Sequence, residues 1–139
     1  YKKFLGRICC YFPLMSIYGE QIIDLYKHPL NQGSLTHPTV SFRAFNPLCG
    51  DDMTVDLLLK NGVVTDIRHR GNGCAISQAS VSLLTEETKG KSKKEIMGFS
   101  TEMVLELLGV SLGPVRLKCA LLGLEAIHKA LLQYEEKNS

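Results

Sequence analysis

The hydrophobic period of this chain changes at about residue 70, and this change limits its fold class more than any other feature. Between residues 39 and 70 apolar and polar side chains alternate, which is the period of half-buried strands. After residue 70 the apolar residues recur at helical spacing as far as the C-terminal region. Strands grouped first and helices grouped after them are typical of an α+β domain. We therefore predict a small antiparallel sheet with helices packed on one face.

The second and third expected strands, 53–59 and 63–70, are joined by a tight hairpin whose register can be argued. A two-residue loop would place charged residues opposite the apolar face, whereas a three-residue loop, 60–62, keeps that face apolar. The longer loop needs a left-handed backbone at Gly62, which glycine tolerates. We therefore predict a three-residue hairpin. Its pairs would be Leu59 with Val63, Leu57 with Thr65, and Val55 with Ile67.

Helical spacing and end signals predict the remaining elements. A short helix is expected over 18–26, and a longer one begins after residue 70 and ends before Gly90. Further helices are expected over 91–97 and 101–108. The longest starts at Gly113-Pro114, because proline suits the first helical position.

The first fourteen residues differ from the rest of the chain. They contain three basic side chains and no acidic one, and Pro13 interrupts their apolar stretch. We interpret residues 1–14 as an extension outside the fold and 15–139 as a single domain. Cys9 and Cys10 belong to the extension.

Composition narrows the classes of partner. Sixteen basic and fourteen acidic side chains give a net charge of +2, too small to make nucleic acid or an anionic membrane the expected partner. No apolar run reaches membrane-spanning length. Five cysteines are an odd number, and a domain of this size needs no disulfides to fold. We therefore expect a reducing, cytoplasmic setting and cysteines that bind metal or carry sulfur.

Three cysteines lie where expected elements meet. Cys49 lies in the loop between the first two strands, Cys74 lies where the third strand gives way to a helix, and Cys119 lies near the start of the last helix. The positive end of a helix stabilises a thiolate relative to a thiol. Arg116 and Lys118 add positive charge beside Cys119 and are predicted to balance the thiolates.

Asp51 is a fourth candidate ligand, two residues after Cys49. Three thiolates and one carboxylate suit tetrahedral zinc, and thiolates also hold iron–sulfur clusters. With zinc the site would carry a charge of 2 − 3 − 1 = −2. No two cysteines have C-x-x-C spacing. From placement alone, three buried thiols that merely pack as small hydrophobes remain an equal alternative.

Several motifs carry a resemblance to a known family. The chain resembles the U-type iron–sulfur scaffold family, whose members include IscU, SufU and the N-terminal part of NifU. The similarity runs in the family's order from about Met15 to the C-terminus. Its motifs here are DLYKHP and NQG in residues 24–33, NPLCGDD in 46–52, GCAISQAS in 73–80 and PVRLKCALL in 114–122.

The resemblance implies a SufE/NifU-like α+β fold with a three-stranded sheet. It implies that Cys49, Asp51, Cys74 and Cys119 converge at one exposed end and bind zinc or a labile [2Fe-2S] cluster. It also implies a cysteine desulfurase that delivers persulfide sulfur, downstream iron–sulfur acceptor proteins, and a monomer or weak oligomer. Cys49 is the candidate sulfur acceptor because a loop ligand moves more easily than a helical one, and Cys119 is the alternative.

The branch within the family stays open. IscU-type members usually carry histidine where this chain has Lys118, and the residues after Cys49 and Cys74 resemble those of SufU. The extra segment that SufU-type members carry between the second and third cysteines is absent. The protein would therefore be a scaffold or a zinc-dependent sulfurtransferase. A structural zinc module that docks partners without moving sulfur is the alternative from another class.

Overall fold

The computed structural model of the protein describes residues 17–47 and 50–138. The elements within these ranges follow the order α2 (Ile17–Lys27), β1 (Val40–Phe45), β2 (Asp52–Lys60), β3 (Val63–Arg70), α3 (Ala75–Thr88), α4 (Lys93–Met97), α5 (Thr101–Leu108) and α6 (Pro114–Asn138). The interpretation of residues 1–14 as an extension concerns a segment outside the described residues.

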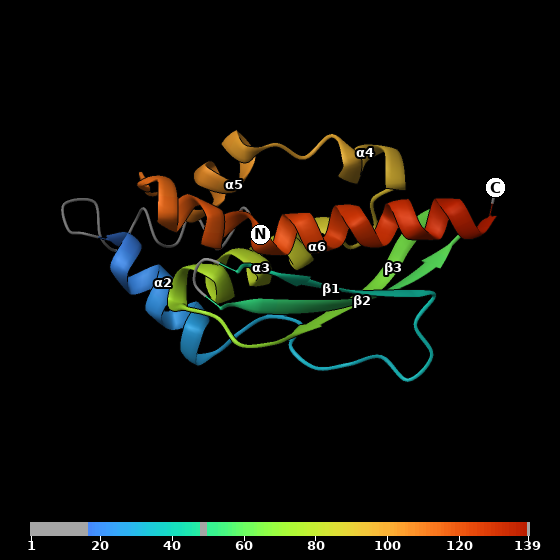
Figure 1. Ribbon diagram of the computed structural model, residues 1–139, viewed down its shortest axis with the longest axis horizontal. Helices are drawn as coiled ribbons and strands as arrows, with labels where there is room; N and C mark the ends of the chain where they lie inside the picture. Colours follow the sequence, from blue (N-terminus) through green and yellow to red (C-terminus); the bar gives the residue numbers. More distant parts are fainter. Residues whose placement is uncertain (1–16, 48–49, 139) are drawn as a thin grey trace.

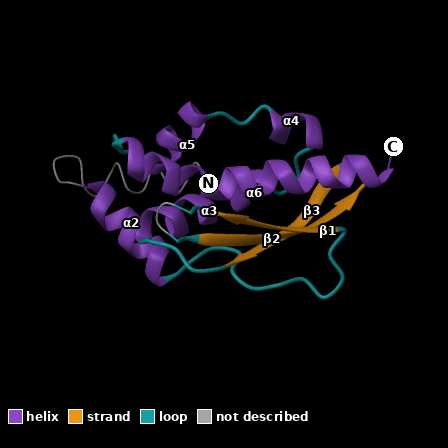
Figure 2. Cartoon of the chain, in the orientation of Figure 1, coloured by secondary structure: helices purple, strands orange, loops and turns teal. Residues whose placement is uncertain are grey.

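The domain has the predicted α+β fold. Its sheet has the strand order β1-β2-β3, and both strand pairs are antiparallel. Its alternation places one set of side chains in the core. The buried members are Val40, Ala44, Met53, Val55, Leu57, Leu59, Val64 and Ile67. Figure 2 shows the three strands as one layer beneath the helices, which confirms the predicted arrangement.

The predicted hairpin register is wrong. The turn has two residues, Asn61 and Gly62, with φ of 54° and 77°, so Leu59 pairs with Val64 rather than Val63. An irregularity between Leu58 and Leu59 then shifts the ladder. Beyond it, Leu57 pairs with Ile67 rather than Thr65, and Val55 with His69 rather than Ile67. A bulge lets the favoured two-residue turn coexist with an apolar inner face.

The helices cover one face of the sheet. The long helix α6 lies over β1 and β2, and α3 lies beside it and contacts β3 (Figure 1). The residues of α3 are buried on nearly all sides, so this helix is the centre of the domain rather than an amphipathic surface helix. The shorter helices α4 and α5 lie on the side of these two helices away from the sheet (Figure 1).

A segment covering residues 28–39 runs past the other face of the sheet (Figure 1). It is fixed there by Asp56, which is 2% exposed and accepts hydrogen bonds from Leu35 N at 3.0 Å, Arg70 at 2.8 Å and Ser41 Oγ. Burial alone would raise the pKa of Asp56. The hydrogen bonds outweigh it, so the pKa lies below its ordinary value.

Two histidines join separate parts of the chain. His69 is fully buried, and its Nε2 lies 2.8 Å from the carbonyl oxygen of Leu30. Burial lowers its pKa. His128 Nε2 lies 2.8 Å from the carbonyl oxygen of Ile96 and so links α6 to α4. Each histidine therefore uses its Nε2 for a contact with a backbone carbonyl oxygen.

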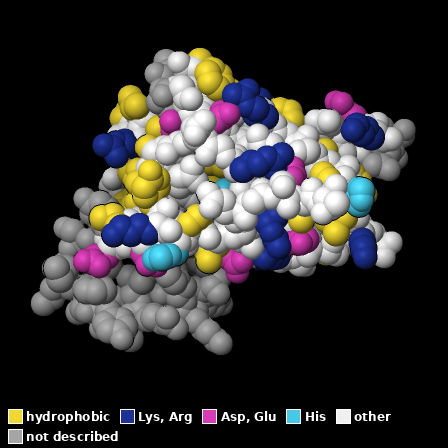
Figure 3. Space-filling view, turned by 90° about the horizontal axis from the view of Figure 1, so that it is seen from below, with side chains coloured by type: hydrophobic (Ala, Val, Ile, Leu, Met, Phe, Trp, Pro, Cys, Tyr) yellow, Lys and Arg dark blue, Asp and Glu magenta, His cyan; other side chains and the backbone are white. Residues whose placement is uncertain are grey.

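Surface charge is mixed. Basic and acidic side chains are interspersed over the face seen in Figure 3. Three lysines before and at the start of α4 form ion pairs with acidic residues. The pairs are Lys89–Glu86, Lys91–Glu87 and Lys93–Glu135. Within residues 17–47 and 50–138, no helix is both long and apolar enough to cross a bilayer.

Candidate metal centre

Three of the predicted ligands meet at one place. One oxygen of Asp51, the sulfur of Cys74 and the sulfur of Cys119 all lie within 4.8 Å of one another. Asp51 stands just before β2, Cys74 immediately precedes α3, and Cys119 is in the second turn of α6. Cys49, the fourth predicted ligand, lies outside the described residues. That these residues bind metal remains a prediction.

A glycine-rich turn brings Cys74 to Asp51. Asp52 N donates to Asn72 O, and Asn72 N donates to Asp52 Oδ1, both at 2.8 Å. Gly71 has φ of 145°, and a Cβ there would lie 2.3 Å from Asp52 O. Only glycine fits this approach. The turn between β3 and α3 is therefore fastened to the start of β2, beside Asp51.

Asp52 has a structural role that the sequence did not indicate. Its side chain is 17% exposed and forms an ion pair with Arg43 at 2.8 Å. The backbone N–H of Asn72 and the Arg43 guanidinium hold the pKa of Asp52 below its ordinary value. An aspartate beside a loop carries no local signal for this contact.

The Asp51 carboxylate occupies the N-terminal end of α3. Cys74 is the N-cap residue but makes no side-chain capping bond, and the first turn of α3 contains no acidic residue. Instead, Asp51 Oδ2 lies 3.5 Å from Cys74 N and 3.4 Å from Ser77 Oγ. The carboxylate thus lies where the unpaired N–H groups of the helix favour negative charge.

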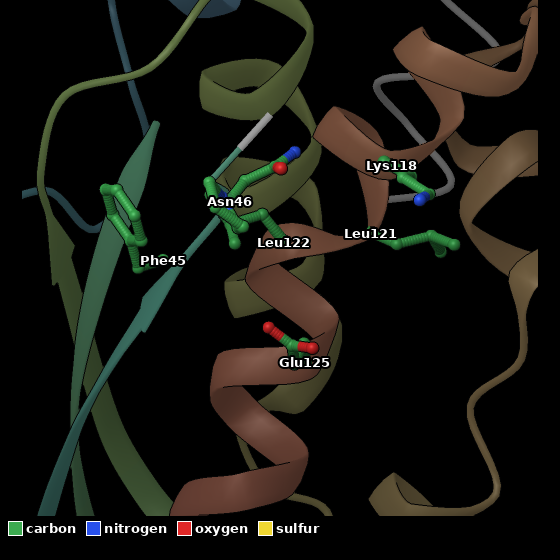
Figure 4. Close-up of a pocket in the computed structure, with 7 residues that line it drawn as sticks. Phe45, Asn46, Lys118, Leu121, Leu122 and Glu125 are labelled. Carbon is green, nitrogen blue, oxygen red and sulfur yellow. The ribbon is translucent and has the colours of Figure 1, made fainter. Parts of the chain in front are cut away.

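The two basic residues near Cys119 are both exposed. Lys118 lines a hollow of about 310 Å³ between the end of β1 and α6, together with Phe45 and Glu125 (Figure 4). Charge balance by Arg116 and Lys118 remains a prediction. The remaining lining residues are Asn46, Pro47, Leu121 and Leu122.

The three neighbouring candidate ligands differ in exposure. Cys119 is 5% exposed and lies among the core residues, whereas Asp51 and Cys74 are partly buried. Thiolates with a carboxylate can hold a thiophilic metal, and a thiolate can also attack an electrophilic sulfur. Within the described residues, no histidine joins this group.

A match to a family model and the similarity to individual relatives both identify one family for this chain. Residues 17–139 match the family described as NifU-like N terminal domain. The zinc-dependent sulfurtransferase SufU of Bacillus subtilis is 33% identical, over 90% of this chain and 96% of the relative. The iron–sulfur cluster assembly scaffold protein IscU of Haemophilus influenzae is 35% identical, over 86% and 97%.

The fold agrees with a solved structure. The N-terminal NifU-like protein of Brucella abortus superposes with a TM-score of 0.71 at 26% identity, covering 86% of this chain and 95% of that one. The chain therefore belongs to the NifU-like N-terminal domain family, the iron–sulfur cluster assembly scaffolds that include IscU and SufU.

Proposed function

We propose that this protein accepts persulfide sulfur from a cysteine desulfurase and binds zinc or a labile [2Fe-2S] cluster through Cys49, Asp51, Cys74 and Cys119. The observation that carries the proposal is the convergence of Asp51, Cys74 and Cys119 from three distant parts of the sequence. Thiols that packed only as small hydrophobes would not be expected beside a carboxylate, because an apolar contact does not compensate a partly buried charge.

The donor set fits zinc. Tetrahedral ligation with Zn–S bonds of about 2.3 Å needs donor atoms roughly 3.8 Å apart, and the three donors here lie within 4.8 Å of one another. Small side-chain rotations therefore suffice. When bound, zinc keeps thiols deprotonated at neutral pH. In the scaffold form iron takes the place of zinc, and Asp51, a weaker ligand than a thiolate, keeps the cargo cluster exchangeable.

Sulfur transfer is a thiol–disulfide-type exchange. The acceptor thiolate attacks the outer sulfur of the desulfurase persulfide, a new S–S bond forms, and the desulfurase cysteine leaves as a thiolate. The step is neutral in redox terms. We assign it to Cys49, which stands in a loop sequence between Pro47 and Gly50. Cys119 is the alternative acceptor, although its burial in α6 restricts access.

Two relatives support two versions of this function. SufU is named as a zinc-dependent sulfurtransferase and IscU as a cluster scaffold. In either version the sulfur moves on to downstream iron–sulfur acceptor proteins. Lys118 and Arg116 would offset the negative charge of the loaded site.

One experiment separates these versions. The purified protein is incubated with a cysteine desulfurase and cysteine, and its metal content and cysteine-bound sulfur are then measured. Zinc with a persulfide supports sulfur transfer, and iron with cluster absorption supports the scaffold. A metal-bound protein that never accepts sulfur or builds a cluster would be a docking module, and the proposal would be wrong.

The ligand set has its own test. Cys74→Ala should lose bound metal, because it removes a thiolate from the centre of the donor group. Cys10→Ala is the matched control, since it removes a cysteine that we place outside the site. Full metal retention by Cys74→Ala would contradict the ligand set.

A further inference from the structure

We propose that Ser77 positions the Asp51 carboxylate and so determines how tightly the metal centre retains its metal. This inference rests on the proposed metal-binding function. It adds a residue that makes no bond to the metal itself. The argument rests on the contacts of the Ser77 hydroxyl, on the space kept for it by Gly73, and on the helix end to which it belongs.

The Ser77 hydroxyl contacts the side chain of one predicted ligand, Asp51, and the backbone of another, Cys74. Ser77 is fully buried in the first turn of α3. Its Oγ lies 3.0 Å from the carbonyl oxygen of Cys74 and 3.4 Å from Asp51 Oδ2. A hydroxyl has one proton, so it donates to one of these acceptors at a time. It can donate either to the backbone of Cys74, which is the shorter contact, or to the carboxylate of Asp51.

Both contacts of the carboxylate fall on the same oxygen. Cys74 N and Ser77 Oγ both approach Asp51 Oδ2. These two contacts restrain the direction of the Asp51 carboxylate before metal arrives.

Gly73 keeps the space that the hydroxyl fills. A Cβ at Gly73 would lie 2.2 Å from Ser77 Oγ and 3.3 Å from Ser77 Cβ. Gly73 does not have a left-handed backbone, so the turn itself does not require glycine here. What glycine provides is room for the Ser77 hydroxyl beside Asp51.

Loss of this hydroxyl should weaken metal binding. A carboxylate without its hydrogen-bonding support must be ordered by the metal itself, and removal of such outer partners typically lowers metal affinity about 10- to 100-fold. We therefore expect Ser77→Ala to bind Zn²⁺ at least about 10-fold more weakly than the parent chain. It should also release Zn²⁺ faster to a chelator.

The experiment is a Zn²⁺ titration of the full chain against a chromophoric chelator. Ser80→Ala is the matched control, because Ser80 is equally buried in α3 but donates to Ala120 O. Its zinc affinity should stay within about twofold of the parent. Urea unfolding of each variant in the metal-free state checks that the fold is retained.

A double-mutant cycle with Asp51→Ala isolates the positioning role. If Ser77 acts through Asp51, Ser77→Ala should cause no further loss of zinc affinity when Asp51 is already alanine. An equal loss in both backgrounds would show that Ser77 acts only through the start of α3, and the inference would be wrong.

A second variant keeps the hydroxyl but moves it. Gly73→Ala should displace Ser77 Oγ and weaken zinc binding much as Ser77→Ala does. Parent-like zinc affinity in either variant overturns the role of Ser77 while leaving the proposed function intact. A parent chain that binds no zinc and no iron overturns both.

Discussion

Gly123 in α6 offers a test of how α3 and α6 are held together. It is buried where α6 crosses α3, and a Cβ built on it would lie 2.9 Å from both Cβ and Cγ2 of Val81. Real Cβ atoms do not sit this close to other carbons, so Gly123→Ala must push the helices apart or distort Val81. The expected result is a less stable protein.

The magnitude follows from two opposing effects. Alanine in place of glycine in a helix interior gains about 1 kcal/mol. Overpacking of a core costs about 1–3 kcal/mol. Val81 is fully buried and β-branched, so its side chain cannot rotate out of the way. The upper part of that range therefore applies, and the net loss should be about 1–2 kcal/mol.

Urea unfolding at neutral pH measures the free energy of unfolding. Gly113→Ala is the control for steric crowding, because a Cβ there meets nothing within 4 Å. Gly113 O accepts from Leu117 N at the N-cap of α6, where alanine is less favourable than glycine, so a loss below about 1 kcal/mol is expected. Val81→Ala removes the contact with Cγ2 but keeps the contact with Cβ, so in that background Gly123→Ala should destabilise less than it does in the parent. A Gly123→Ala protein as stable as the parent, or an equal loss with and without Val81, would refute the reasoning.

Two pH effects follow from the buried titratable groups. His69 has a folded-state pKa below its ordinary 6.5, so the unfolded chain takes up its proton first. The free energy of unfolding should fall as the pH drops from about 7 towards the folded-state pKa, by at most about 1.4 kcal/mol per pH unit. His69→Phe should remove this slope, seen in urea midpoints between about pH 5 and 7.5; an unchanged slope would contradict it. Asp56 has a lowered folded-state pKa, so its contribution is present above its ordinary pKa and is lost as the pH falls through the lower folded value. Asp56→Asn should cost about 2 kcal/mol at pH 7 by weakening three hydrogen bonds, and the mutant and parent should converge in stability towards acid pH in thermal unfolding curves; a constant difference would count against the assignment.

Local patterns predicted most of the fold. The alternation of β1 and β2 placed the correct side chains inside, because one buried face of a sheet leaves a period of two in the sequence. The helix over Thr101–Leu108 was predicted to the residue. Its end depends on Gly109, which takes φ of 71° at the C-cap, a signal contained in a few neighbouring residues.

The features that were predicted wrongly or missed depend on a strand irregularity or on contacts between distant residues, neither of which leaves a local pattern in the sequence. The prediction of the hairpin register was wrong because a bulge on β3 accommodates a one-residue shift. No single residue in the sequence predicts that bulge. Asp52 and Ser77 were not recognised as part of the site's framework. Their partners are a turn about 20 residues away in one case and a carboxylate from another loop in the other.

The position of Asp51 fits the proposed metal site, which would be filled and emptied without strain. A carboxylate that served only the metal would be left uncompensated whenever the metal departed. Here Asp51 Oδ2 faces the backbone N–H of Cys74 and the Ser77 hydroxyl at the positive end of α3. These same groups stabilise the carboxylate before metal arrives and after it leaves. The framework that we propose to orient Asp51 as a ligand would therefore also support the metal-free state, and this is what a protein proposed to receive and hand on its cargo requires.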